Sequence, residues 1–321
     1  MTKKSRKHQE PTKGKLHIRN LHNQKYDLST LVKSVPQLKA FIIKNIKGED
    51  TVQFAEPEAV MLLNKALLLT HYDIDYWELP EGYLCPPVPG RADYIHHASD
   101  LLAGKNFGKI PKAHLLDVGV GANCIYPILG TALYDWSFVG SEIDAFAIEH
   151  ANGIIQKNAR LTKQLELRRQ ENKDAVLQGV LQAEEKFDLV ICNPPFHRSA
   201  EDAQENADRK VKNLNKGRSL ETKLNFSGQA HELWCPGGEK RFISTLVNES
   251  KDFAKQCFWF TSLVSKAAHL KALEDSLDYH QAVELRTINM TQGNKSSRIL
   301  AWTFLNKEEQ VEWRKSRWEK A

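Results

Sequence analysis

The sequence has no long hydrophobic run. No apolar stretch approaches the roughly 18 residues that cross a bilayer, and none follows the basic start Met1–Lys7 as a secretory signal would require. We therefore expect a cytoplasmic protein without a membrane partner. With 321 residues, 41% hydrophobic and 26% charged, the chain is also neither collagen-like nor wholly disordered.

Paired cysteine motifs are missing as well. The chain has no CxxC or CxxxxC pair, and His231 with Cys235, a His/Cys pair at helical spacing, supplies only two ligands. We expect neither a metal site nor disulfides, only reduced thiols that pack as small hydrophobic side chains. The five cysteines are Cys85, Cys124, Cys192, Cys235 and Cys257.

Basic charge is concentrated at the N-terminus. Residues 1–26 carry eight basic side chains and one acid, a net +7, whereas the whole chain is +5. A basic arm without an adjoining amphipathic stretch favours nucleic acid over membrane as the partner, and a solubilising tail is the alternative. The basic side chains are Lys3, Lys4, Arg6, Lys7, Lys13, Lys15, Arg19 and Lys25.

A helical cap is predicted to follow this flexible arm, over residues 27–110. Pro57 and its acidic neighbours open an amphipathic helix. A proline-rich stretch at 85–90 then separates it from another helix over about 91–102.

Short apolar strands alternate with amphipathic helices over residues 111–308, which predicts an α/β fold with a doubly wound, mostly parallel sheet. The last two strands have no helix between them and should be antiparallel. This seven-stranded, Rossmann-like layout resembles class I methyltransferases. Residues 197–236 form a long charged loop, and 309–321 are expected to be a tail. The predicted strands are 114–118, 137–140, 164–168, 187–192, 257–264, 282–287 and 298–304.

A glycine-rich turn follows the first of these strands. The strand ends in Asp117-Val-Gly119-Val-Gly121, a pattern that lets backbone approach a ligand closely. Glu142, at the tip of the next strand, is placed to accept hydrogen bonds from a ribose. The third glycine of dinucleotide-binding folds is missing, which favours S-adenosylmethionine as cofactor. A tight turn beside a surface acid would show the same pattern.

A second motif, Asn193-Pro194-Pro195-Phe196, follows the buried strand 187–192. Two prolines fix the backbone, so the Asn193 side-chain oxygen and the Pro194 carbonyl would accept from one exocyclic amine while Phe196 stacks on its ring. Methyl transfer would then depend on positioning and not on a strong base. An Asn-Pro turn leaving a strand is the alternative, but the two motifs together favour a methyltransferase.

These residues resemble the amino-methyltransferase branch of class I S-adenosylmethionine-dependent enzymes, in which [DN]PP[FYW] is diagnostic. A closer resemblance, to the bacterial 23S ribosomal RNA adenine-N6 methyltransferase family, covers about residues 15–306. It is carried by segments 16–20, 54–60, 87–96, 121–127, 224–229, 232–239, 259–265 and 297–303.

The resemblance implies a substrate and roles for further residues. The substrate would be an adenine of 23S ribosomal RNA, free or in a large-subunit assembly intermediate, and we expect a monomer. Asn123 would lie near the methionine end of the cofactor and Arg91 against its carboxylate. RNA would contact the arm, the 197–236 loop and the last hairpin. Residues implied in RNA binding or in shaping the substrate pocket are Lys210, Lys212, Lys295, Ser296, Arg298, 225–228 and 237–239.

Three other functions fit parts of the sequence. A DNA adenine methyltransferase would share the Asn-Pro-Pro-Phe motif but would normally add a target-recognition domain. A protein-glutamine methyltransferase would use the same amine geometry without needing a basic arm. An inactive RNA-binding scaffold would be expected to have lost Asn193 or Gly119, and both are present.

Overall fold

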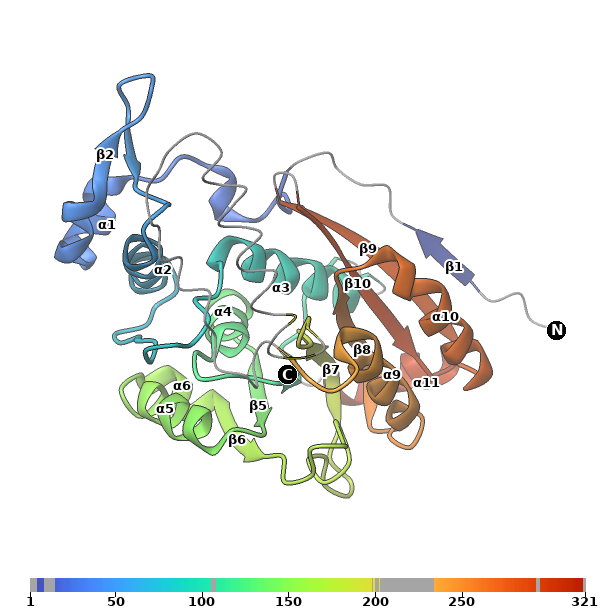
Figure 1. Ribbon diagram of the computed structural model, residues 1–321. Helices are drawn as coiled ribbons and strands as arrows, with labels where there is room; N and C mark the ends of the chain where they lie inside the picture. The colour runs from blue at the N-terminus through green and yellow to red at the C-terminus, as the bar shows by residue number, and fades with distance from the viewer. Residues whose placement is uncertain are drawn as a thin grey trace.

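A mixed β-sheet forms the centre of the computed structural model, which describes residues 5–8, 15–104, 108–197, 199, 202, 234–292 and 295–319. Within these residues the strand order is β1-β9-β10-β8-β7-β4-β5-β6, with helices on both faces (Figure 1). The strands of this sheet are β1 (Ser5–His8), β4 (His114–Val118), β5 (Ser137–Glu142), β6 (Leu165–Arg169), β7 (Phe187–Cys192), β8 (Cys257–Val264), β9 (Glu284–Gln292) and β10 (Lys295–Thr303).

The sheet confirms the predicted doubly wound layout. Strands β6, β5, β4, β7 and β8 are mutually parallel, and β10 runs antiparallel to both β8 and β9. Two features were not predicted. The last two strands are longer than expected and pair as far as Gln292 and Lys295, and β1 adds an eighth strand parallel to β9.

Alternate side chains of the strands enter two separate cores. In β4, Leu115 belongs to the core that α3 and α4 cover. The next residue, Leu116, belongs to the core that α9 and α10 cover. Burial on both faces explains the continuous apolar runs of β4 and β7. The helices are α1 (Leu28–Ser34), α2 (Pro57–His71), α3 (Val88–Ala103), α4 (Ile125–Tyr134), α5 (Ala145–Gln156), α6 (Ala159–Gln164), α9 (Gly238–Ser250), α10 (Leu270–Tyr279) and α11 (Lys307–Arg317), with 3-10 turns η1 (Leu21–Asn23), η2 (Pro36–Phe41) and η3 (Ala267–His269).

The region predicted as a helical cap also contains a β-hairpin. Strands β2 (Ile42–Lys44) and β3 (Asp50–Val52) pair antiparallel and project from the N-terminal part of the protein (Figure 1). The side-chain oxygen of Asn45 accepts from the backbone of Lys47 at 2.8 Å and of Glu49 at 3.0 Å, and Gly48 takes φ +76°. Asparagine and glycine at these positions make the turn, a local signal that the prediction overlooked.

The predicted C-terminal tail is largely helix α11. Asn306 and Glu309 form a capping box at its start. Trp313 and Trp318 are buried, and their ring N–H groups donate to Asp188 at 2.7 and 2.9 Å. The expectation of a tail differs from the structure because this helix is stabilised by tertiary contacts with β7, which its charged sequence does not reveal.

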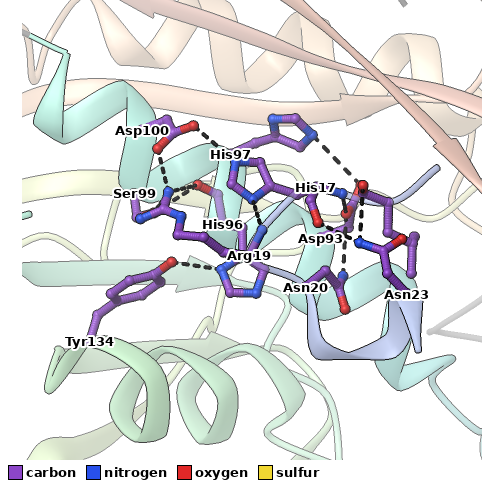
Figure 2. Close-up of polar contacts among 11 residues, drawn as sticks. His17, Arg19, Asn20, Asn23, Asp93, His96, His97, Ser99, Asp100 and Tyr134 are labelled. Carbon is purple, nitrogen blue, oxygen red and sulfur yellow. Dashed lines mark hydrogen bonds and ion pairs between the residues drawn. The ribbon is translucent and has the colours of Figure 1, made fainter. Parts of the chain in front are cut away.

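The last part of the predicted flexible arm is packed against α3. The Arg19 guanidinium donates to the Ser99 hydroxyl at 2.9 Å and to Asp100, and the backbone N–H of His17 donates to Asp93 (Figure 2). From residue 15 onward, the segment is therefore held by a polar network along one helix. Asp100, about two turns after Asp93 in the same helix, supplies the charge opposite to that of Arg19.

Two histidines of this region are buried. His96 hydrogen-bonds the Tyr134 hydroxyl at 2.6 Å, and burial, together with the electrostatic effect of the neighbouring His17 and Arg19, lowers the pKa of His96 to about 3. His22 hydrogen-bonds Tyr72 at 2.7 Å, and burial lowers the pKa of His22 to about 4. Both imidazoles are therefore neutral in the folded protein at neutral pH.

These pKa values predict destabilisation by mild acid. The unfolded histidines have a pKa of about 6.5, so between roughly pH 6.5 and 4 the unfolded chain binds protons that the folded chain does not. The free energy of unfolding should fall as the pH drops through this window, by on the order of 1 kcal/mol per pH unit for each histidine. Urea denaturation at pH 7, 6 and 5 measures the free energy of unfolding. In His96→Asn this free energy should change less steeply with pH than in the wild type. An identical slope in both proteins would contradict the assignment.

Candidate active site

Both sequence motifs meet at one edge of the sheet. β4 and β7 are parallel neighbours, with Val118 opposite Cys192. The glycine turn that follows β4 therefore lies beside the Asn193 turn that follows β7. The order of the strands reverses between β4 and β7, and the crevice at such a switch point is where open α/β sheets bind ligands.

A cavity of about 460 Å³ opens at this point. It is large enough for a nucleoside-sized ligand and lies between α3, the ends of β4, β5, β6 and β7, and the start of α9. Among the residues that line it are Arg91, Gly119, Gly121, Asn123, Glu142, Asn193 and Pro195. The structure thus brings together seven residues that were predicted for the cofactor and catalytic sites.

The glycine turn places backbone at the cavity wall. Gly119 and Gly121 have φ of +75° and +64°, a region that side-chain-bearing residues rarely adopt. The N–H groups of Gly119 and Val120 donate to the Ser141 carbonyl at 2.9 and 3.0 Å, which fixes the turn to β5. A Cβ atom at Gly119 would meet no other atom within 4 Å and would occupy the cavity itself.

Glu142 is oriented by backbone donors at the tip of β5. Its carboxylate accepts from the N–H groups of Gly121 at 3.0 Å, Ile143 at 2.8 Å and Asp144 at 3.1 Å. Burial nevertheless raises the pKa of Glu142 above its ordinary value. The carboxylate is held in one orientation at the cavity and retains acceptor capacity for hydroxyl donors.

Asp117 is 1% exposed, and neither of its carboxylate oxygens has a hydrogen-bond partner among the described residues. Burial raises the pKa of Asp117 well above its ordinary value, and the nearby Glu142 raises it further, while Arg91 lowers it. An unpaired buried carboxyl is costly in a folded protein. The arrangement is explained if a cationic group of a ligand pairs with Asp117.

Arg91 points to the cavity because Tyr126 holds it. Its Nη1 donates to the Tyr126 hydroxyl at 3.0 Å, and its guanidinium carbon lies 5.6 Å from the centre of that ring. Tyr126 also contacts Tyr94 edge-on, with ring centres 5.4 Å apart. An arginine near the start of a helix would ordinarily be solvated, so this guanidinium is placed by packing between α3 and α4.

Asn123 shapes the turn that leads into α4. Its side-chain oxygen accepts from the Ile125 N–H at 3.0 Å, and its backbone carbonyl accepts from the Trp77 ring N–H at 3.0 Å. Cys124 follows with φ +50°, a strained value for a residue that is not glycine. Asn123 lines the cavity and at the same time fixes the start of the helix.

The Asn193 side chain has an unused acceptor. Its oxygen Oδ1 is buried, with no hydrogen-bond partner among the described residues, although the side chain borders the cavity. Pro194 is buried, and Pro195 lines the same cavity. Phe196 borders a second, neighbouring cavity of about 250 Å³, together with residues at the start of α9. The Asn-Pro-Pro-Phe turn therefore separates two cavities.

The residues predicted to contact RNA are dispersed. Arg19 is engaged with α3, Lys15 is exposed, and Arg298 pairs in register with Val264, the last residue of β8, at the sheet edge that carries the site. Arg6 and Lys7 belong to β1, and Lys295 begins β10. Lys3, Lys4, Lys13, Lys210, Lys212 and segment 225–228 lie outside the described residues.

Sequence reasoning missed several contributors to the cavity, among them Gln170 and Tyr126. Gln170 directly follows β6, so its place at the carboxyl end of a parallel strand was a usable signal. Tyr126 had no such local signal, because its role depends on how α4 packs against α3.

Within the described ranges, no three His, Cys, Asp or Glu side chains are grouped so as to hold a metal ion. Across the same residues, none of the helices combines the length and apolar character that spanning a membrane requires.

The sheet order, the antiparallel β10 and a nucleoside-sized cavity at the β4/β7 switch point define a class I, S-adenosylmethionine-dependent methyltransferase. Residues 10–306 match the model of a family described as RNA methyltransferase. The chain belongs to that family.

Curated relatives cover nearly the whole chain. A protein of Photobacterium profundum named ribosomal RNA large subunit methyltransferase F is 47% identical over 99% of both chains. Proteins with the same name from Pectobacterium carotovorum and Flavobacterium johnsoniae are each 49% identical, over 95% and 94% of this chain and 98% and 97% of theirs.

Solved structures agree with the fold. The catalytic domain of human METTL16 in complex with the MAT2A 3′UTR hairpin 1 is 27% identical with a TM-score of 0.75, covering 91% of this chain and 96% of that chain. The N-terminal domain of human METTL16 in complex with SAH is 25% identical with a TM-score of 0.72, covering 91% and 99%.

Proposed function

We propose that the chain transfers a methyl group from S-adenosylmethionine to the N6 amine of an adenine in 23S ribosomal RNA. Relatives that are 47–49% identical over nearly the full length carry the name ribosomal RNA large subunit methyltransferase F. The substrate is the free RNA or a large-subunit assembly intermediate, and the enzyme acts in the cytoplasm as a monomer. The concentrated positive charge of the N-terminal arm supports an RNA substrate.

The observation that carries the amine chemistry is the buried Oδ1 of Asn193 at the cavity wall, which has no hydrogen-bond partner in the part of the chain that the structure describes. An acceptor in that position selects a donor group such as an exocyclic NH₂, and its desolvation is offset only when that donor arrives. The Pro194 carbonyl offers a second acceptor for the same amine. Two accepted hydrogens orient the nitrogen lone pair, so the reaction depends on geometry and the amine proton is released after transfer.

The residues of the larger cavity fit S-adenosylmethionine. Arg91, which lines this cavity, would pair with its carboxylate, and Asp117, buried just before the glycine turn, would pair with its amino group. Glu142, held by three backbone donors, would accept from the ribose hydroxyls. The cofactor supplies an electrophilic methyl group on a sulfonium sulfur, and the glycine turn lets it lie against the backbone at Gly119.

Replacing Asn193 tests the amine assignment. Asn193→Ala should lower kcat by on the order of 100-fold or more, because it removes an acceptor that orients the nucleophile. Asn193→Asp keeps an acceptor oxygen and should retain more activity. Both variants should bind S-adenosylmethionine and RNA within a few-fold of the wild type. The measurement is transfer of labelled methyl to separate RNA, DNA and protein pools, followed by nucleoside analysis; equal turnover in the two variants would refute the assignment.

Replacing Asp117 tests the cofactor site. Asp117→Asn should weaken S-adenosylmethionine binding by about tenfold or more, because the neutral amide cannot balance the ammonium charge. The raised pKa of Asp117 has a further consequence in the wild type: affinity should fall as the pH drops through it, at a higher pH than for an ordinary carboxyl. Calorimetric titration at pH 8 and 6 measures both effects. A variant with the same pH dependence as the wild type would exclude Asp117 as the titrating group.

Replacing lysines of the arm tests its role in RNA binding. Changing Lys3, Lys4, Lys7 and Lys13 to glutamine should reduce the slope of log affinity against log salt concentration by about three, because fewer counterions are released from the RNA. Arg19 is left unchanged because it anchors the segment to α3. A control with Lys307 and Lys315 of α11 replaced should keep the wild-type slope. Equal slopes in all three proteins would leave the arm without a part in binding.

A further inference from the structure

The second cavity, bordered by Phe196, is lined by basic side chains. Lys240 in the first turn of α9, Lys266 after β8 and His269 all line it. Lys240 and Lys266 are exposed, and neither forms an ion pair with any residue that the structure describes. Three groups able to carry positive charge thus converge on one cavity that opens beside the Asn-Pro-Pro-Phe turn.

A buried carboxylate fixes the relative positions of these groups. Glu239 is 2% exposed; one of its oxygens accepts from the Ser265 N–H at 2.6 Å and the other is hydrogen-bonded to His269 Nδ1 at 2.8 Å. The contacts connect the start of α9 to the segment after β8. Since the carboxylate accepts from Nδ1, this contact leaves Nε2 for another partner, and Nε2 donates to an anion when both ring nitrogens carry a proton.

The position of the cavity relative to the methyl donor defines what it can hold. Asn193 and Pro195 line the larger cavity, whereas Phe196, the last residue of the motif, lines the second one. In-line transfer requires the amine to approach from the side opposite the departing sulfur. The nucleotide that carries the amine must therefore extend away from the cofactor, on the side of Phe196.

We propose that Lys240, Lys266 and His269 bind a backbone phosphate that flanks the target adenosine. The inference rests on the proposed function and extends it by naming the residues that hold the RNA strand at the reacting base. A phosphate matches the site because it carries full negative charge next to a base stacked on Phe196, and it would neutralise lysines that have no acidic partner in the described structure. The start of α9, whose N-cap Gly237 provides no capping side chain, adds backbone donors on the same side.

Charge-removing variants give the first test. Lys240→Gln and Lys266→Gln should each raise KM for a 23S ribosomal RNA transcript about five- to twenty-fold and reduce the salt slope by about one, with unchanged affinity for S-adenosylmethionine. Lys266→Arg should restore most of the loss. Lys251→Gln is the matched control, because Lys251 is exposed at the opposite end of the same helix, roughly 16 Å from Lys240 at about 1.5 Å per residue. Equal effects of the site variants and of Lys251→Gln would overturn the proposal.

A double-mutant cycle gives the second test. The methylated adenosine is first mapped with the wild-type enzyme, and short RNAs are then made with one neutral methylphosphonate linkage on either side of it. The wild type should lose about fivefold or more in kcat/KM with one of these RNAs, and Lys266→Gln should lose little further with the same RNA. Fully additive losses would show that the lysine and that phosphate do not interact, and would overturn the proposal.

The two tests separate this inference from the proposed function. If the wild-type enzyme does not methylate adenine in RNA, the proposed function fails, and the inference that rests on it fails with it. If it does, and the methylphosphonate penalty is the same in wild type and Lys266→Gln, only the phosphate site fails.

Discussion

The hydrogen-bonded register between β4 and β7 is the constraint on which the site depends. Parallel neighbours end at the same edge of the sheet, so pairing Val118 with Cys192 brings the glycine turn and the Asn193 turn together. A shift of one residue would turn Asp117 away from its present position, because successive side chains point to opposite faces. Burial of both faces under helices makes that register strongly favoured.

The site pairs rigid backbone with polar groups left without partners. The glycine turn is fixed to Ser141 and Glu142 is fixed by three N–H donors, whereas the oxygens of Asp117 and Asn193 Oδ1 are buried without described partners. Unsatisfied buried groups destabilise the protein without ligand, and positions that tolerate this cost are typical of binding sites. Under the proposed function, cofactor and substrate would supply the missing partners and so turn that cost into binding energy.

The N-terminal part of the chain supports the site as well as carrying charge. Residues 17–20 are held along α3 by hydrogen bonds (Figure 2). The same helix carries Arg91, whose guanidinium is held at the cavity by Tyr126. The packing of α4 against α3 thus determines where a charged side chain of the cavity lies.

Local sequence was enough to locate the strands that carry the motifs, because β4, β7 and β8 are short apolar runs bounded by clear turn residues, and to expect an antiparallel end to the sheet. It also identified the glycine and Asn-Pro-Pro-Phe turns, since those backbones require particular residue types. Tertiary structure alone decided the addition of β1, the docking of α11 on Asp188, the anchoring of Arg19 and the support of Arg91 by Tyr126. Each of these depends on residues far apart in the chain, whose contacts form only when the sheet and its helices are packed, so no local pattern records them.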